Sequence, residues 1–432
     1  MILSGLSEPG SVPFMTNYII LALCVIIILS YLFDISSRYS RVPGIILLIG
    51  LGIALQLISL STGFDIPNLK PILPVIGTLG LVMIVLDASL DLKLEKKKSR
   101  VLINTVLSAL VLLILVVTIG SLVLVKIFGH TPISAVLNMI PLGIISSAAA
   151  IPSAEGLSSK EKEFIVYESS FSDILGIMAF DFILLGQSEM NLGVGNFLIA
   201  GFLTIVIAAV TTVGLAWLLH KANYHVNYVI IMTFVVLVYV LAELYHLPAL
   251  LLVLVFGLAL SNNRIVENTF ISRYIEFGKF NRDLNAFRRI LGELTFLVRS
   301  FFFIIFGYYT SVEGVFYPEN LITAFIITAG ILLIRWLFFY CILRIKSLPL
   351  VLFAPRGLIT ILLFLSIPAA YMIPEINTEV ITLVILMTLL AMMLGNIISP
   401  RKAKRVVSAA KTDPQETDIE NQAHNNLPEE IK

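Results

Sequence analysis

The stretch FIVYESSFSDILGIMAFDFILL, residues 164–185, is long enough to cross a lipid bilayer as a helix, because about 20 residues span about 30 Å of hydrocarbon. It nevertheless contains three carboxylates, Glu168, Asp173 and Asp181. A charged side chain at the centre of such a helix costs about 2.5–3.5 kcal/mol on insertion scales, so charges retained there are candidates for function. The stretch predicts a membrane helix whose acidic residues are candidates for a functional role.

The composition of the whole chain favours a membrane protein. Of its 432 residues, 58% are hydrophobic and only 13% are charged, which excludes an ordinary soluble domain. Backbone groups in lipid must be satisfied internally, and runs of this length do so as helices. We therefore predict an all-α polytopic membrane protein. About thirteen spans are expected, at residues 15–33, 42–60, 72–92, 101–126, 132–154, 164–186, 192–219, 227–242, 248–261, 293–312, 320–345, 349–370 and 376–400.

The connectors between these spans alternate in charge. Lysine and arginine favour cytoplasmic loops, and every second connector is basic, most clearly KLEKKKSR at 93–100. This alternation predicts an outside N-terminus and a cytoplasmic C-terminus. We expect a multi-pass protein of the bacterial inner (plasma) membrane. We expect residues 262–292 to form a cytoplasmic amphipathic connector lying at the interface, and the tail 401–432 to be disordered.

The span count also accommodates an inverted repeat. Spans 1–6 and 8–13 are related by an offset of seven spans. Because seven is odd, matching spans run in opposite directions. In secondary transporters, such repeats place the substrate site near the midplane, on helices that are broken there. The matching spans 5 and 12 both carry helix breakers: Pro152 in the fifth, and Pro355 with Gly357 in the twelfth.

Some charges in the spans have simple explanations. Asp87 lies at the basic cytoplasmic end of its span, where a neighbouring lysine can pair with it. Arg299 lies near the cytoplasmic start of its span, and we expect it to snorkel to the interface. Asp181 and Glu243 lie near outer ends, within reach of water.

Four charges are harder to explain: Glu168, Asp173, Arg335 and Arg356. Glu168 and Arg335 lie at compatible depths, and a buried pair of this kind can be purely structural. Asp173 lies near the midplane and points about 140° away from Glu168 around the helix, so we expect it to have different partners. A carboxyl group without a cationic partner can bind a proton or a small monovalent cation, but not both. That competition is sufficient to couple two ion fluxes.

Three motifs resemble a known family. YESSFSD at 167–173 resembles the E-S-x-x-N-D helix of the monovalent cation:proton antiporter superfamily, in its sodium/proton exchanger branch. LLIRW at 332–336 resembles the arginine helix of that branch, and APRGLITILLFLSIP at 354–368 is similar to its L-R-G-x-x-x-L-x-L-x-L-S-I-P signature.

The resemblance implies a core transport domain that moves against a dimerisation domain, with crossed, partly unwound helices at spans 5 and 12. The expected parts are a scaffold at 1–92 and 227–312, a core at 101–186 and 320–400, a linking helix at 192–219 and the tail at 401–432.

The resemblance also implies roles for individual residues. Asp173 becomes the site that binds the monovalent cation or the proton. The residues expected around it are Ser169, Ser172 and Ser147 as further ligands, Glu168 with Arg335 as the core ion bridge, and Arg356, Pro355, Gly357 and Pro152 as support for the crossing. A single aspartate, where a second branch has two, implies electroneutral one-for-one exchange.

The sequence departs from the family pattern at three places. The asparagine before the aspartate is Ser172, and the T-D-P of the fifth span reads Ser147-Ala148-Ala149, which leaves the partner of Arg356 open. A glycine at the end of the third span is Asp87, which could add a second charge to the ion pathway.

The sequence thus predicts a secondary transporter without a cofactor, not an enzyme. Its expected partners are Na⁺ (or Li⁺ or K⁺), H⁺, membrane lipid and a second copy of the chain, with no nucleic acid. One alternative is a sodium-coupled organic-anion transporter in which Arg356 binds the anion. Another is an intramembrane aspartyl protease, for which Asp173 and Asp87 are the only plausible catalytic pair. The residues do not discriminate Na⁺ from K⁺.

Overall fold

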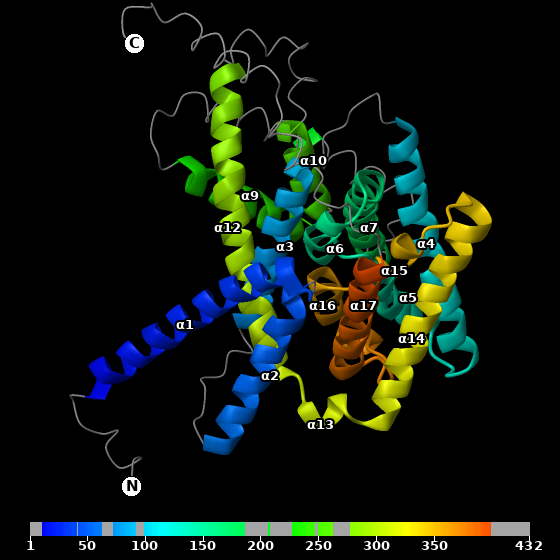
Figure 1. The fold of residues 1–432 in the computed structure, drawn as a ribbon, viewed down its shortest axis with the longest axis horizontal. Helices are drawn as coiled ribbons and strands as arrows, with labels where there is room; N and C mark the ends of the chain where they lie inside the picture. Colours follow the sequence, from blue (N-terminus) through cyan, green and yellow to red (C-terminus); the bar gives the residue numbers. More distant parts are fainter. Residues whose placement is uncertain are drawn as a thin grey trace, which may run out of the picture.

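The protein is helical throughout its described part (Figure 1). The computed structural model describes residues 11–40, 42–62, 72–91, 99–185, 206–207, 227–245, 247, 249–261 and 277–398. The helices are α1 (Ser11–Ser40), α2 (Gly44–Thr62), α3 (Ile72–Asp91), α4 (Ser99–Lys126), α5 (Pro132–Gly143), α6 (Ser147–Ser153), α7 (Ser159–Leu185), α9 (Asn227–Leu244), α10 (Ala249–Ser261), α12 (Phe277–Tyr309), α13 (Val312–Val315), α14 (Pro318–Leu337), α15 (Leu348–Leu352), α16 (Leu358–Leu365) and α17 (Thr378–Ile398). Nearly all of the predicted span 192–219, and the tail 401–432, lie outside the described residues, so the count of thirteen stays a prediction.

Within the described residues, six helical segments are long and apolar enough to cross a membrane. They are Gly44–Thr62, Val101–Lys126, Pro132–Ser153, Leu284–Tyr309, Pro318–Leu343 and Thr378–Ile398. Shorter apolar helices occur at Leu23–Ser36, Val75–Leu90, Tyr228–Leu244 and Ala249–Ser261.

The distribution of side chains fits a lipid environment. Large apolar residues face outward, such as Leu60 and Phe325, which are 74% and 65% exposed. Charged side chains lie inside, and Arg335 is only 1% exposed. A protein in water has the opposite arrangement, because charged residues are rarely buried there and large apolar surfaces are covered.

Two groups of helices lie side by side (Figure 1). In one group α12 packs against α2 and α3, α3 packs against α10, and α10 packs against α9. In the other, α4 packs against α5 and α7, and α14 packs against α17. Glycines allow α2 and α12 to approach closely in the first group. A Cβ added to Gly52 of α2 would overlap the carbonyl of Ile304 in α12. A Cβ added to Gly307 of α12 would overlap the carbonyl of Ile49 in α2. Small residues permit such backbone contact between membrane helices.

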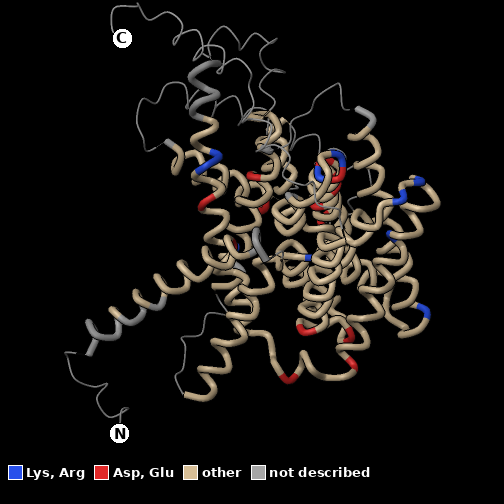
Figure 2. The backbone as a smooth tube through the Cα atoms, viewed as in Figure 1, with Lys and Arg blue, Asp and Glu red and all other residues tan. Residues whose placement is uncertain are grey.

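Charged residues gather toward the two ends of the bundle (Figure 2). The lower end in this view carries acidic residues where α13, α14 and α17 begin. Each of these helices has a glutamate in its first turn, namely Glu313, Glu319 and Glu379.

Two helices in the described part of the chain are interrupted, and their unwound segments lie against each other. The first breaks between α5 and α6, where Ile144 and Ser146 are extended. The second breaks between α15 and α16 at residues 353–357. The first break does not lie at Pro152, which sits inside α6. Tertiary hydrogen bonds hold the unwound backbone instead, since Ile145 N donates to Ser172 Oγ (2.9 Å) and Ser146 N donates to Pro355 O (2.9 Å).

The second half of the predicted interfacial connector at 262–292 belongs to a longer helix. Residues from Phe277 onward belong to the single long helix α12, which continues through the span to Tyr309. Leu284, Phe287 and Leu291, whose spacing indicated a surface helix, are buried inside the molecule. The helix is thus longer than the span predicted at 293–312, and the interfacial position of its first part stays a prediction. Residues 262–276 lie outside the described part.

Candidate functional site

Asp173 lies on α7 and is 5% exposed. Its Oδ2 accepts a hydrogen bond from the backbone N–H of Ser147, at 3.0 Å, and the Ser147 hydroxyl lies near the same carboxylate. Its Oδ1 has no hydrogen-bond partner, and no lysine or arginine of the described chain forms an ion pair with it. Buried carboxylate oxygens are normally satisfied, so an open one marks a position where a ligand can bind.

A small cavity adjoins this carboxylate. Its volume is about 10 Å³, enough for about one water molecule. The cavity is lined by Ile84, Val85, Ala88, Ser89, Ser170, Asp173, Ile174, Leu254 and Ile359. These residues come from α3 and α10 of the first group of helices and from α7 and α16, so Asp173 faces the boundary between the two groups.

The predicted serine ligands are arranged differently from one another. Ser147 contacts Asp173 through its backbone N–H. Ser172 accepts from Ile145 N and so supports the unwound segment. Ser169 donates to Ile165 O within α7, at 2.7 Å, and no hydrogen bond joins it to Asp173. The structure therefore brings Ser147, but not Ser169, to the carboxylate.

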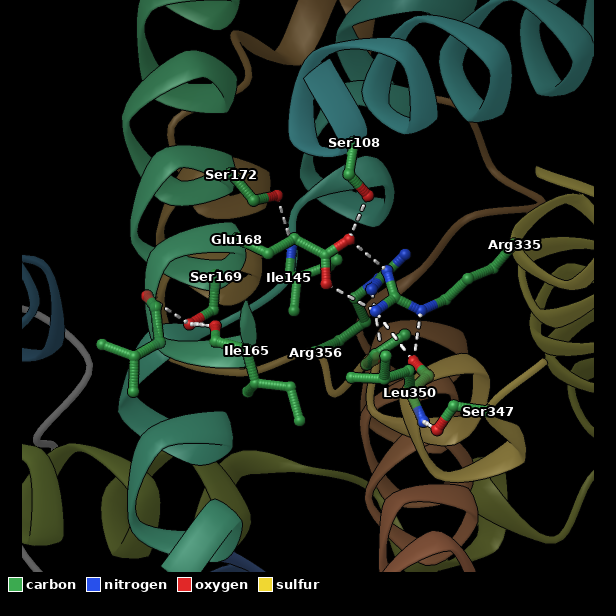
Figure 3. A network of polar contacts seen from close by, with 12 residues as sticks. Ser108, Ile145, Ile165, Glu168, Ser169, Ser172, Arg335, Ser347, Leu350 and Arg356 are labelled. Atoms are coloured by element: carbon green, nitrogen blue, oxygen red, sulfur yellow. Dashed lines mark hydrogen bonds and ion pairs between the residues drawn. The ribbon is translucent and has the colours of Figure 1, made fainter. Parts of the chain in front are cut away.

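Glu168 and Arg335 form a bidentate ion pair in the interior (Figure 3). Arg335 Nη1 donates to Glu168 Oε1 (2.9 Å) and Nη2 donates to Oε2 (2.6 Å), and both residues are 1% exposed. Ser108 of α4 donates a further hydrogen bond to Oε1, a contact that hydropathy does not reveal. Arg335 also donates to Leu350 O from Nε (3.0 Å) and Nη2 (2.9 Å), and its guanidinium lies 4.8 Å from the Phe339 ring centroid. The pair joins α7 to α14 and α15.

Arg356 donates to backbone carbonyls at both helix breaks. Its Nε donates to Leu142 O (2.7 Å) and its Nη1 to Ala354 O (2.9 Å), while its own N–H donates to Thr388 Oγ1 (3.0 Å). Leu142 lies in the last turn of α5, where carbonyls lack intrahelical donors and carry partial negative charge. The carbonyls of Leu142 and Ala354 are thus the partners of the Arg356 guanidinium within the described residues.

The crossing depends on the absence of a side chain at Gly357. A Cβ added there would lie 2.5 Å from Ser146 Oγ and 2.9 Å from Ser146 Cβ. We expect Gly357→Ala to destabilise the protein by about 1–3 kcal/mol, the usual cost of overpacking, measured by thermal unfolding in detergent. Gly330→Ala on α14 is the control, since nothing lies within 4 Å of its added Cβ. Wild-type melting of Gly357→Ala would contradict the close crossing, and Ser146→Gly should rescue the variant.

Neither Asp87 nor Arg299 lines the cavity beside Asp173. Asp87 is a partly buried residue of α3 and does not line that cavity. Together with Asp34 it lies within electrostatic range of Arg299 on α12. Arg299 does not snorkel as predicted. Its Nη1 donates to Ala148 O of α6, at 3.1 Å, because that carbonyl offers an acceptor inside the protein.

Comparison with known proteins identifies the family. The family model described as "Sodium/hydrogen exchanger, transmembrane" matches residues 21–400. A search of curated proteins found no match. Among solved structures, the sodium proton antiporter MjNhaP1 from Methanocaldococcus jannaschii at pH 8 matches with a TM-score of 0.65 and 20% identity, over 88% of this chain and 98% of that one. An electron-microscopy map of the same antiporter matches with a TM-score of 0.63 and 19% identity, over 88% and 95% of the two chains. The fold is that of this antiporter, and the chain belongs to the sodium/hydrogen exchanger family of integral, multi-pass membrane transporters.

Proposed function

We propose that the protein exchanges a monovalent cation, Na⁺, Li⁺ or K⁺, for H⁺ across the membrane, with both ions binding in turn at Asp173. One observation carries this proposal: Asp173 is buried, has no cationic partner within the described chain, and leaves Oδ1 open beside a cavity. An ionised carboxylate in such a place needs a positive ion. A proton and a metal cation satisfy this need equally, and each excludes the other.

The charges around the site support one-for-one stoichiometry. Glu168 is neutralised by Arg335, so Asp173 is the carboxylate that changes its occupancy. If the carrier reorients only when Asp173 is neutralised, each cycle moves one charge in each direction. The net charge moved is zero, and exchange is electroneutral.

Alternating access requires one body to move against another. We propose that 101–186 and 320–400 form the moving core, that 1–92 and 227–312 form a scaffold that dimerises, and that 192–219 links them. The cavity beside Asp173 is lined by both groups of helices, and a sliding boundary there would expose the carboxylate to each side in turn. The Glu168–Arg335 pair supports rigid movement of the core, because it ties the two halves of the core together. The connectors at the end of the bundle where α14 and α17 begin, residues 310–317 and 371–377, contain no lysine or arginine, which supports an external position for that face.

The two other functions lack comparable support. Transport of an organic anion by Arg356 requires a free guanidinium, but this one is 1% exposed and donates to two carbonyls. An aspartyl protease requires Asp87 to face Asp173, but Asp87 does not line the cavity that Asp173 adjoins.

Reconstituted protein tests the proposed exchange. Proteoliposomes with a clamped membrane potential should take up a monovalent cation when an outward proton gradient is imposed. The rate of uptake should not change with the potential. The KM for the cation should rise as pH falls, by up to about tenfold per pH unit where protons occupy the site, because the two ions compete. Measuring Na⁺, Li⁺ and K⁺ side by side identifies the cation. A rate that follows the potential would contradict electroneutrality, and a KM that does not depend on pH would contradict the shared site.

A further inference from the structure

One carbonyl in α6 lacks its usual partner. In an α-helix the carbonyl of residue i accepts from the N–H of residue i+4. The donor that corresponds to Ala148 is residue 152, which is Pro152 and has no N–H. Ala148 O therefore needs another donor, because an unsatisfied buried carbonyl is costly.

Arg299 supplies that donor from a different part of the molecule. Its Nη1 lies 3.1 Å from Ala148 O. Arg299 belongs to α12, which packs against α2 and α3, whereas α6 packs against α7. Asp87 and Asp34 lie within electrostatic range of the guanidinium and help to hold its charge in place. The proline and the arginine therefore create a hydrogen bond between the two groups of helices.

The acceptor of this bond, Ala148, is the chain neighbour of the residue that donates to the Asp173 carboxylate. Ser147, which precedes Ala148, donates its N–H to Asp173 Oδ2 at 3.0 Å. α6 is only seven residues long and follows an unwound segment, so its own helical bonds restrain it weakly. The position of Ala148 O thus controls where the Ser147 N–H points.

We propose that Arg299 is a positioning residue for cation binding, which acts through α6, and that Pro152 serves to leave Ala148 O open for it. This rests on the proposed exchange at Asp173. A donated N–H favours the ionised carboxylate, which is the form that binds a cation. Releasing α6 removes that support and lets protons compete more strongly.

Cation-exchange kinetics test the arginine. Arg299→Ala should raise the KM for the transported cation about tenfold, the size expected from losing one hydrogen bond to a charged group. The maximal rate per folded molecule should change much less, and the KM effect should grow as pH falls. Arg299→Lys, which keeps a charged donor, should recover part of the affinity. A residue with only a structural role would lower the amount of active protein and leave KM unchanged. Arg289→Ala is the control, because Arg289 is an exposed arginine on the same helix.

Pro152 provides a second arm. Pro152→Ala restores an N–H that competes for Ala148 O, so KM should rise in the same direction but less than in Arg299→Ala. In the Arg299→Ala background the same change should have almost no further effect, because no guanidinium remains to be displaced. Pro141→Ala is the matched control, since Pro141 also lies inside an interrupted core helix and no arginine donates to Leu137, the residue four before it, within the described contacts. Full additivity of the two changes would overturn the coupling between Pro152 and Arg299.

Amide hydrogen exchange tests the anchoring without transport. Arg299→Ala should speed exchange in the peptide that covers residues 147–158, and leave the centre of α4 unchanged. Unaltered amide exchange in 147–158 would overturn the positioning role even if the KM rose as expected. An inactive wild type would refute the proposed exchange instead, so the two failures can be told apart.

Discussion

Asp173→Asn should abolish pH-gradient-driven cation exchange in proteoliposomes. Asparagine has the same shape as aspartate, and its side-chain oxygen can still accept from Ser147 N, which lies 3.0 Å from the native carboxylate. It cannot ionise, however, so it neither attracts a cation nor binds and releases a proton. We expect exchange at the level of empty liposomes, while thermal unfolding in detergent stays close to that of the wild type.

The same substitution at a second aspartate of α7 provides the control. Asp181 is partly buried, lies near Glu243 of α9 and does not line the cavity beside Asp173. Asp181→Asn should retain exchange. Robust exchange by Asp173→Asn would remove Asp173 from the role assigned to it, whatever the control shows.

Breaking the ion pair between Glu168 and Arg335 should be the most destabilising single change in the core. Both residues are 1% exposed, and each compensates the charge of the other. Glu168→Ala or Arg335→Ala leaves a buried charge without a partner, which costs about 3–5 kcal/mol. We expect a large loss of folded protein and a much lower melting temperature in detergent.

Two comparisons separate this effect from a general sensitivity to charge. His130 Nε2 and Glu375 Oε2, from residues that precede α5 and α17, lie 2.9 Å apart, with side chains 22% and 35% exposed. Because that pair is in contact with solvent, Glu375→Gln should cost at most about 1 kcal/mol. Replacing Glu168 and Arg335 together by apolar residues should recover much of the stability lost in either single variant. Unchanged melting of both single variants would refute a structural role for the pair.

Much of the fold can be predicted from hydropathy, because a membrane helix needs only length and apolar composition. The span expected at 248–261 is α10, Ala249–Ser261, and the span expected at 101–126 is α4, Ser99–Lys126. The break in the twelfth span is also visible locally, since Pro355 and Gly357 lie within residues 353–357, between α15 and α16.

The break in the fifth span does not follow from Pro152, the breaker predicted from the sequence. The chain unwinds directly after Gly143, where three distant acceptors satisfy its backbone donors: Ser172 Oγ, Pro355 O and the Asp173 carboxylate. Such contacts exist only in the folded molecule. The partners of Arg356 and Arg299 could not be predicted for the same reason. Both arginines donate to backbone carbonyls, which every residue possesses. A freed carbonyl leaves no compositional signal, except where a proline stands four residues later.

Proton release on cation binding tests the shared site most directly. Purified wild-type protein in detergent and weak buffer, held near the pH at which the site is half protonated, should release protons when the transported cation is added. The Asp173→Asn variant should release none. Since the two ions exclude each other at one carboxylate, the protons released should match the cations bound to protonated sites. Saturable cation binding to the wild type without any release of protons would contradict the account.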